Sequence, residues 1–364
     1  MTEQEFTQEL VWQTNSEMIK KQPRPSNPYF QKAYDFMELW INGQEEFNLQ
    51  TSGSTGAPKT IKVTRQQLIS SAAMTGKALN LDKGTHALVC LNVAYVAGIM
   101  MLVRGMELNW ELTIVEPSSN PLLELEQDFD FVAMVPLQLS FCLENEKTKG
   151  MVKHLGKILL GGAPVSISLL KEIANLSVPV YQSYGMTETV SHVALRKLNF
   201  PIEERNYTIL PGVILGQDER GCLYVSGPMT NEEKIQTNDL VNIISANTFT
   251  WLGRIDNVIN SGGVKIILDR VDELIANVFY DQKYTAAFFT WYEKDEKLGQ
   301  KLILIMEKTD QPLQEETILK EIRKKVSAYE TPKHVYFADQ FIKTETDKID
   351  KRRTVEMLFK IING

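Results

Sequence analysis

The chain has 364 residues; 43% of them are apolar, 23% are charged, and the formal net charge at pH 7 is -7. This length and composition predict a globular protein of two or three domains with ample core material. A mildly acidic chain has no broad attraction for nucleic acid or anionic lipid, which excludes both as expected partners.

The cysteines and the first residues of the chain both favour a reducing compartment. Cys90, Cys142 and Cys222 are odd in number, far apart and surrounded by apolar residues, a pattern typical of buried free thiols. The four histidines show no spacing that suits a structural zinc ion. The N-terminal segment is MTEQEFTQEL, which is acidic and polar, unlike a signal peptide. We therefore expect a cytoplasmic protein.

The long apolar run at residues 87–103 falls short of the roughly 20 residues that cross a bilayer, and it contains Asn92 and Gly98. It predicts a buried strand followed by a buried helix, and no membrane partner. Further apolar runs predict strands that end at Pro or Gly: LVCLNV, LTIVEP, FVAMVP, KILLGG and VPVYQSYG. Helical spacing between them, as at residues 167–175, predicts a parallel or mixed sheet covered on both faces. Ligands of such sheets bind beyond the carboxyl ends of the strands, here after KILLGG and VPVYQSYG.

The composition changes after Arg254 and predicts a small α+β domain of about 100 residues. Apolar residues at helical spacing predict one helix over residues 271–278 and another over residues 318–326. Three strands are predicted at AAFFTW, KLILIM and HVYFAD. We place the boundary between the two domains near Asp256.

The segment TSGSTGAPKT combines hydroxyl groups, glycines and Lys59 in one short loop, at residues 51–60. Glycines let backbone N–H groups approach an anion closely, and hydroxyl groups donate to phosphate oxygens. The spacing differs from the phosphate loop of P-loop NTPases, because Pro58 stands five residues after Gly53. On composition alone, a flexible surface loop is an equally good interpretation.

The same segment resembles the signature phosphate loop of the adenylate-forming superfamily, which includes acyl-CoA synthetases, luciferases and peptide-synthetase adenylation domains. Further segments are similar to motifs of that superfamily in the same order: YGMTET from Tyr184, TNDL ending at Leu240, GRIDNVINSGGVKI from Gly253, and KTETDKIDKR near the C-terminus. The resemblance covers roughly residues 48–355, and motifs in this order are far more specific than any one of them.

The resemblance implies an α/β fold with two domains. The large N-terminal domain, residues 1–253, has mixed and parallel sheets covered by helices and a shortened N-terminal region. The small α+β C-terminal domain, residues 254–364, is a mobile lid with its hinge at Asp256. The implied reaction joins a small-molecule carboxylic acid to a thiol: ATP, with Mg²⁺, first converts the acid to an acyl-AMP, and CoA then accepts the acyl group.

The ATP-binding residues implied by the resemblance are Thr51, Ser52, Ser54, Thr55, Lys59, Gly161, Gly162, Ala163, Tyr184, Asp239 and Arg254. The phosphate loop holds the β- and γ-phosphates. Tyr184 lies against adenine, opposite the glycines of LLGGAP. Asp239 accepts the ribose hydroxyl groups, and Arg254 touches the ribose or a phosphate. Outside such motifs, an acidic side chain of this kind is usually a solvated loop residue.

The implied catalytic residues are Thr187, Glu188 and Lys348. Thr187 donates to the α-phosphate, and Glu188 holds Mg²⁺, which offsets phosphate charge. Lys348, in the small domain, neutralises charge while the carboxylate attacks phosphorus. Rotation at Asp256 then removes this lysine and brings in the Gly262–Gly263 loop, which lines the tunnel for the thiol. A plain turn between strands is the alternative interpretation of those glycines.

Two features suggest which acid is used. Only 50 residues precede the phosphate loop, and SYGMTETVSHVALR is similar to the motif of o-succinylbenzoate:CoA ligases of menaquinone synthesis. Tyr95 stands where that subfamily usually has histidine. We expect Tyr95, Arg104, Ser191 and Arg196 near the acid, with either arginine facing a second carboxylate. A surface position is at least as common for an arginine.

Other functions remain open at this point. The nearest is another acyl or aryl acid:CoA ligase, or a stand-alone adenylation enzyme that loads a carrier protein. A non-catalytic nucleotide-binding homologue belongs to a different class. The presence of Lys59, Glu188, Asp239 and Lys348 argues against it, because each serves catalysis rather than folding.

Overall fold

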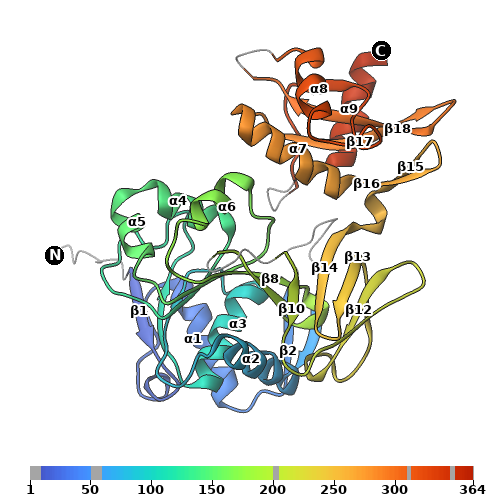
Figure 1. Cartoon of the computed structure of the whole chain (residues 1–364). Coiled ribbons are helices and arrows are strands. Elements are labelled where there is room, and N and C mark those ends of the chain that lie inside the picture. Colours follow the sequence, from blue (N-terminus) through green and yellow to red (C-terminus); the bar gives the residue numbers. More distant parts are fainter. Residues whose placement is uncertain (1–9, 51–59, 200–204, 310–312, 345–348, 364) are drawn as a thin grey trace.

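The computed structural model describes residues 10–50, 60–199, 205–309, 313–344 and 349–363. Most of the strands lie in one large sheet: β1 (Val11–Thr14), β4 (His86–Val89), β5 (Glu111–Val115), β6 (Phe131–Met134), β7 (Lys157–Leu160), β8 (Val180–Gly185), β9 (His192–Lys197), β10 (Tyr207–Ile209), β11 (Ile214–Gln217), β12 (Cys222–Ser226), β13 (Ile235–Ser245) and β14 (Thr248–Arg254). Their order is β1-β5-β4-β6-β7-β8-β9-β10-β14-β13-β12-β11 (Figure 1).

The central strands β5, β4, β6, β7 and β8 run parallel, as the strand-then-helix pattern predicted. From β9 onward the neighbours are antiparallel, and β1 is antiparallel to β5. The sheet is therefore mixed. Because β7 and β8 are parallel neighbours, their carboxyl ends lie at one edge, which brings the LLGG and YGMTET segments together.

Helices cover both faces of the parallel strands. They are α1 (Pro28–Ile41), α2 (Arg65–Leu79), α3 (Val96–Leu108), α4 (Pro136–Glu144), α5 (Glu146–Val152) and α6 (Ile167–Ile173), with short 3-10 turns η1 (Met18–Lys20), η2 (Thr187–Thr189) and η3 (Pro228–Thr230). Side chains of a strand alternate between the faces. In β4, Ala87 and Val89 pack with residues of α1, α2 and α3, whereas Leu88 packs with residues of α4, α5 and α6.

Local sequence signals explain the bounds of α2, a helix that borders the proposed acid pocket. At its start, Thr64 Oγ1 accepts from the Gln67 N–H at 3.3 Å, and Gln67 Oε1 accepts from the Thr64 N–H at 2.9 Å. This reciprocal cap satisfies N–H groups that have no partner within the helix. The helix ends at Asn80, whose φ of 48° belongs to a left-handed cap.

A second sheet lies in the C-terminal lobe, the orange and red part of Figure 1. Its strands are β15 (Val258–Ser261), β16 (Val264–Ile267), β17 (Phe288–Asp295), β18 (Gly299–Glu307) and β19 (Val335–Ala338). Its helices are α7 (Leu268–Gln282), α8 (Glu315–Arg323) and α9 (Lys351–Asn363). The predicted helices and strands of this region are confirmed. Along β18, Leu304 packs with residues of α7 and α8, and its neighbour Ile305 packs with residues of α9.

The two lobes are joined by one short connection. The last strand of the large sheet ends at Arg254, the turn η4 (Ile255–Asn257) follows, and the small sheet begins at Val258. Asp256 therefore lies between the two sheets. The division into domains after Gly253, with a hinge at Asp256, remains a prediction.

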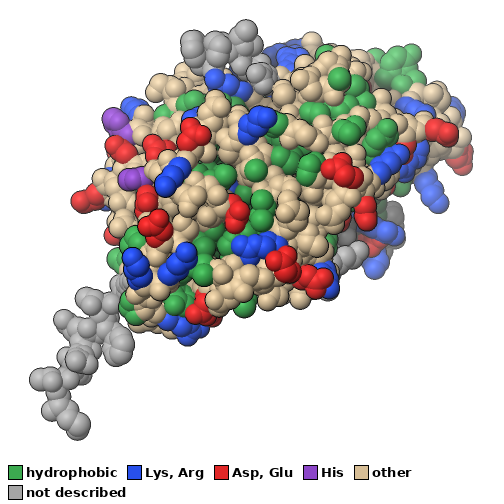
Figure 2. Space-filling view, turned by 90° about the horizontal axis from the view of Figure 1, so that it is seen from below, with side chains coloured by type: hydrophobic (Ala, Val, Ile, Leu, Met, Phe, Trp, Pro, Cys, Tyr) green, Lys and Arg blue, Asp and Glu red, His purple; other side chains and the backbone are tan. Residues whose placement is uncertain are grey.

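On the face shown in Figure 2, acidic and basic side chains are interspersed, so neither sign of charge predominates there. Within the described ranges, every helix is too short or too polar to cross a bilayer. The three cysteines are buried and unpaired, as their spacing predicted.

Candidate active site

Part of the predicted site lies outside the described residues: Thr51, Ser52, Ser54, Thr55, Lys59 and Lys348. The residues that flank this part are described. Strands β2 (Glu46–Gln50) and β3 (Thr60–Thr64) form a separate antiparallel pair in which Gln50 is the partner of Thr60. The first motif therefore begins and ends at adjacent positions of one strand pair.

The glycine loop after β7 lies beside the end of β8. Gly161 N–H donates to the carbonyl of Met134 at 3.1 Å, and Ser183 Oγ donates to the carbonyl of Leu160 at 2.9 Å. A Cβ on Gly161 would lie only 2.6 Å from Ser183 Oγ, so a larger residue would displace that hydroxyl. Gly162 has a φ of 80°, which favours glycine. Gly162 and Ala163 are exposed and open to a ligand.

Tyr184 and Asp239 meet directly, although 55 residues separate them in the chain. The Tyr184 hydroxyl donates to Asp239 Oδ2 at 2.7 Å. The Tyr184 ring lies 5.3 Å from the ring of Phe249 and 5.7 Å from that of Tyr207, measured between centroids. Burial, together with the adjacent carboxylate, raises the pKa of Tyr184 above its usual value. The proposed adenine and ribose contacts are thus neighbours on β8 and β13.

Trp251 is a part of this site that sequence reasoning missed. Its Nε1–H donates to Asp239 Oδ1 at 3.2 Å, so both oxygens of that carboxylate already accept a bond. A carboxylate offers about four lone-pair positions, which leaves about two for the ribose hydroxyl groups. The indole of Trp251 is partly exposed. In the sequence, the only local sign that Trp251 contacts Asp239 is its position three residues before Arg254.

Arg254 and Asp256 form an ion pair at the connection between the lobes. Arg254 Nη2 donates to Asp256 Oδ2 at 2.8 Å, and this bond lowers the pKa of the Asp256 carboxyl. Asn238 Nδ2 donates to the same oxygen at 3.3 Å. From α7, Asp269 accepts from the Arg254 N–H at 2.8 Å and from Asn257 Nδ2 at 2.9 Å. Arg254 therefore contacts the proposed hinge residue in this conformation, rather than standing free for a nucleotide.

The two proposed catalytic residues of YGMTET lie in η2. Glu188 is exposed and forms no hydrogen bond or ion pair with another described residue. No cluster of three or more metal-ligating side chains exists within the described ranges. The predicted role of Glu188 as a ligand of Mg²⁺, an ion usually held by one or two carboxylates together with substrate phosphates, remains a prediction. Thr187 is half-buried, and its carbonyl accepts from the Val190 N–H at 2.8 Å.

A tight turn at Val190 leads from these residues to Ser191. Val190 has φ 66° and ψ -49°, and the Ser191 N–H donates to the Thr189 carbonyl at 2.7 Å. This is a γ-turn of the less common hand, which is strained for a β-branched residue. The Thr189 hydroxyl bonds to the carbonyls of Met186 and Ser191 and holds the turn closed. The backbone strain lies at Val190, directly before Ser191. Strained backbone of this kind is often found at functional sites.

Arg104 lies in α3 against this turn and is 2% exposed. Its Nη2 donates to Ser191 Oγ at 2.9 Å, and its Nη1 contacts Met101 Sδ at 3.7 Å. Its Nε has no partner within the part of the chain that the structure describes, and no described carboxylate forms an ion pair with it. Burial lowers the pKa of Arg104 to about 10, so it is still charged at neutral pH. An unpaired buried cation is costly, which points to an anionic partner from outside the described residues.

The second candidate arginine, Arg196, is in a different situation. Its Nε and Nη2 both donate to Gln182 Oε1, at 3.0 and 2.7 Å, and its guanidinium lies 5.4 Å from the ring centroid of Tyr207. Tyr95 is 39% exposed and stands immediately before α3, where its carbonyl accepts from the Ile99 N–H at 3.1 Å. The structure therefore separates two arginines that the sequence left equivalent.

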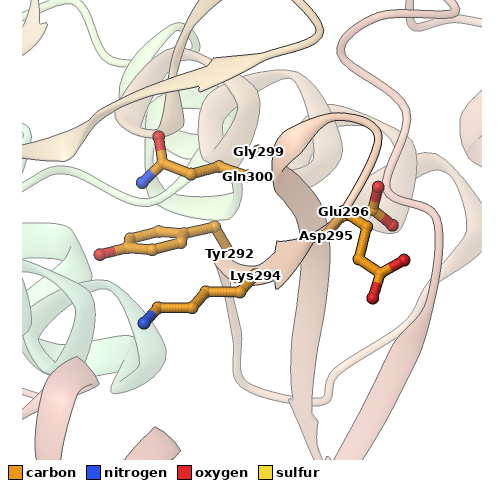
Figure 3. Close-up of a pocket in the computed structure, with 6 residues that line it drawn as sticks. All are labelled: Tyr292, Lys294, Asp295, Glu296, Gly299 and Gln300. Atoms are coloured by element: carbon orange, nitrogen blue, oxygen red, sulfur yellow. The ribbon is translucent and has the colours of Figure 1, made fainter.

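Gly262 and Gly263 form the two-residue turn between β15 and β16, with φ values of 61° and 83°. The Gly262 N–H donates to the carbonyl of Leu298 in the neighbouring β17–β18 turn at 2.9 Å. A hollow of about 500 Å³ lies at that hairpin. In the close-up of Figure 3, its lining side chains Tyr292, Lys294 and Gln300 extend to the same side. A turn is thus the local structure of the glycines; their proposed role in the thiol tunnel remains a prediction.

A second hollow, of about 400 Å³, lies beyond the carboxyl ends of β4 and β6. Its lining includes Cys90, Asn92, Ser118, Val135 and Gln138. It is at the same edge of the sheet as the loops after β7 and β8, where ligands of such sheets bind. The predicted acid contacts Tyr95, Arg104, Ser191 and Arg196 are not among its lining residues.

Several basic residues lie near Lys348 in the terminal motif, so the sequence alone does not identify the catalytic lysine with certainty. The structure shows what one of these neighbours, Lys351, contacts. Lys351 Nζ donates to Asp272 Oδ2 at 2.7 Å, and Asp272 Oδ1 accepts from the hydroxyl of Thr290 at 2.7 Å. Lys351 therefore fastens α9 to α7. Arg352 pairs with Glu356 within α9. The role of Lys348 as the catalytic lysine remains a prediction.

Comparison with known proteins agrees with the motifs. The family described as AMP-binding enzyme matches residues 47–229. A 2-succinylbenzoate–CoA ligase of Bacillus cereus (strain Q1) is 24% identical over 369 residues, which cover 90% of this chain and 76% of that protein.

Solved structures are similar as well. An acyl-CoA synthetase (AMP-forming)/AMP-acid ligase II-like protein from Dyadobacter fermentans DSM 18053 is 60% identical, with a TM-score of 0.68 over 96% of this chain and 100% of that chain. The o-succinylbenzoate coenzyme A synthetase (MenE) of Bacillus subtilis, in complex with ATP and magnesium ion, is 20% identical, with a TM-score of 0.70 over 85% of this chain and 69% of that chain. The predicted fold, a large mixed sheet and a smaller C-terminal sheet, is confirmed by this likeness.

Proposed function

The chain belongs to the AMP-binding enzyme family and is an AMP-forming acid–thiol ligase, and from this premise we propose that its acid is o-succinylbenzoate and its thiol is CoA. The observation that carries the choice of acid is Arg104, a buried cation without a carboxylate partner among the described residues. A second carboxylate on the substrate supplies that partner. Such an activity belongs to menaquinone synthesis, which is consistent with a role inside the cell.

The reaction has two steps. In the first, a carboxylate oxygen of the acid attacks the α-phosphorus of ATP, and pyrophosphate leaves. In the second, the sulfur of CoA attacks the acyl carbon, and AMP leaves. The nucleotide binds at the edge formed by β7 and β8, with Tyr184 at adenine and Asp239 at the ribose. Thr187 donates to the α-phosphate, and Glu188 holds Mg²⁺, which offsets the charge of the phosphate oxygens.

The position of Arg104 gives the acid an orientation. Arg104 contacts Ser191, which follows η2 after two residues, so the cation binds a residue that is close in the chain to the proposed α-phosphate contact Thr187. One carboxylate of the acid faces the phosphate while the other reaches the guanidinium. A monocarboxylic acid leaves the cation unpaired, and this penalises its binding by roughly 2–5 kcal/mol.

The proposal is tested by ATP–pyrophosphate exchange over a panel of acids, followed by thioester formation with CoA or a holo carrier protein. We expect o-succinylbenzoate to support both steps with free CoA, and benzoate and medium-chain fatty acids to do so poorly. Exchange with fatty acids or benzoate at least as fast as with o-succinylbenzoate would show that the acid is wrong, while the ligase assignment stands. Transfer to the carrier protein but not to CoA would show that the thiol is wrong.

Replacement of Asp256 by proline tests the proposed hinge. Proline fixes φ at a position that must rotate between the two steps. We expect adenylation to survive while CoA transfer falls, measured as pyrophosphate exchange and as thioester formation from supplied acyl-AMP.

The matched control is Asp256→Ala, which removes the bonds from Arg254 and Asn238 but leaves φ free. The alanine variant is expected to keep both steps. If the proline variant also runs both steps normally, Asp256 is not the hinge.

A further inference from the structure

A buried polar cluster lies between α2, α3 and the start of β9, inside an otherwise apolar core. Its members are Ser71, Thr75, Arg104, Ser191 and His192, of which Thr75 is fully buried and His192 is 6% exposed. Ser191 and Arg104 belong to the proposed acid pocket. The proposed function gives no role to Thr75 or His192, although burying a polar group is costly unless it is hydrogen-bonded. Within the described residues, Ser71 Oγ and Arg104 Nε lack such a bond.

The groups at the two ends of this cluster fix the direction of each hydrogen bond, because Arg104 can only donate and the Ser71 carbonyl can only accept. The Thr75 hydroxyl has one proton, which it donates to the carbonyl of Ser71 at 3.0 Å. Thr75 Oγ1 must therefore accept from His192 Nε2, which lies 3.2 Å away. His192 then carries its proton on Nε2, and Nδ1 is an acceptor. At 3.3 Å from Nδ1, the Ser191 hydroxyl is the donor.

The same reasoning extends to Arg104. A guanidinium is only a donor, so Arg104 Nη2 donates to Ser191 Oγ at 2.9 Å. Since the Ser191 proton is already committed to His192, the lone pairs of Ser191 Oγ are turned toward the cation. The chain of bonds thus runs in one direction, from Arg104 through Ser191, His192 and Thr75 to the carbonyl of Ser71.

The imidazole stays neutral in this environment. Burial, followed by the positive charge of Arg104, lowers the pKa of His192 well below its ordinary value. No other charged group contributes to this shift. A charged ring would place a second buried cation beside Arg104, with only the Ser191 hydroxyl between them. The neutral ring instead accepts the Ser191 proton and leaves Arg104 as the one cation of the cluster.

We infer that His192 is a positioning residue for acid recognition: anchored by Thr75, it accepts the Ser191 hydroxyl proton on Nδ1 and thereby holds Arg104 in place for the substrate's second carboxylate. The inference rests on the proposed function, because it takes Arg104 as the carboxylate contact. The inference also goes beyond the proposed function, because His192 touches neither the acid nor the nucleotide and acts through Ser191. Its effect is therefore on the KM for the acid rather than on turnover.

The first experiment reads the proton positions directly and does not depend on the identity of the acid. The protein is labelled with ¹⁵N-histidine, and the ring nitrogens of its four histidines are followed from pH 6 to pH 8. We expect His192 to remain the Nε2–H tautomer throughout, with the Thr75→Val variant losing this preference. A proton on Nδ1, or a charged His192 ring at pH 7, overturns the inference.

The second experiment separates KM from kcat. We expect His192→Phe to raise the KM for o-succinylbenzoate about tenfold, with changes under twofold in kcat and in the KM for ATP. His192→Asn, which retains an acceptor near the Nδ1 position, should recover part of the loss, and Thr75→Val should raise the KM about threefold. An unchanged KM for the acid in both His192→Phe and Thr75→Val overturns the inference, as does a parallel loss in kcat and in ATP binding.

The two proposals fail in different ways. If the wild-type enzyme does not use o-succinylbenzoate, the proposed acid is wrong, and the same variants are measured with the acid that gives the fastest pyrophosphate exchange. If His192→Phe does not fold, the milder Thr75→Val variant and the tautomer measurement still decide the role of His192.

Discussion

Replacement of Lys348 by alanine is expected to lower acyl-adenylate formation by roughly 10²–10³-fold, the usual cost of removing one group that stabilises developing charge. The resemblance to the adenylate-forming superfamily implies that this lysine binds the attacking carboxylate and the α-phosphate in the first step. In the proposed two-conformation mechanism it leaves the site before CoA binds, so thioester formation from supplied acyl-AMP should be largely retained. The measurements are pyrophosphate exchange for the first step and thioester release for the second.

Lys351→Ala provides a matched control three residues away. Lys351 bonds to Asp272 between α9 and α7, so its loss should lower the melting temperature of the protein without a selective loss of adenylation. The cost of leaving that carboxylate without its charged partner is roughly 1.5–3 kcal/mol. Equal damage to both steps in Lys348→Ala would contradict the two-conformation mechanism. Selective loss of adenylation in Lys351→Ala would move the catalytic role to that lysine.

Replacement of Arg104 by leucine is expected to lower kcat/KM for o-succinylbenzoate by at least about 30-fold, since roughly 2 kcal/mol or more of carboxylate binding is lost. Activity toward monocarboxylic acids should fall little or rise, because they no longer leave a cation unpaired. The folded protein should not become less stable, because a leucine in an apolar core replaces a buried charge that forms no ion pair with any described carboxylate. Competition between o-succinylbenzoate and a monocarboxylic acid measures the change in selectivity.

Arg196→Leu is the matched control, since it removes the same charge from β9, the strand that begins beside Ser191. Gln182 already takes two of its donors, so we expect a much smaller effect on selectivity. If Arg196→Leu abolishes the preference for the dicarboxylic acid and Arg104→Leu does not, the assignment of the two arginines is reversed. If neither changes it, the second carboxylate binds elsewhere.

Much of the architecture was predictable because periodicity is local. Short apolar runs such as those that became β6 and β7 alternate with helical segments, and this order alone predicted parallel strands with helices on both faces. The adjacency of the LLGG and YGMTET loops followed from the rule that parallel strands end at one edge. The antiparallel strands after β8 were not predicted, although they carry Asp239 and Arg254 on neighbouring strands.

The sequence by itself determined the fold class, the family and the order of the motifs, because these depend on residue type and spacing along the chain. It left Arg104 and Arg196 equivalent, and it gave no sign that His192 has a role. Only the tertiary structure distinguished the surroundings of these residues, by bringing Ser191 to Arg104 across 87 residues and Thr75 to His192 across 117. The physical reason is that the energy of a charge depends on its burial and on its partners, which come from distant segments and are absent from any local pattern.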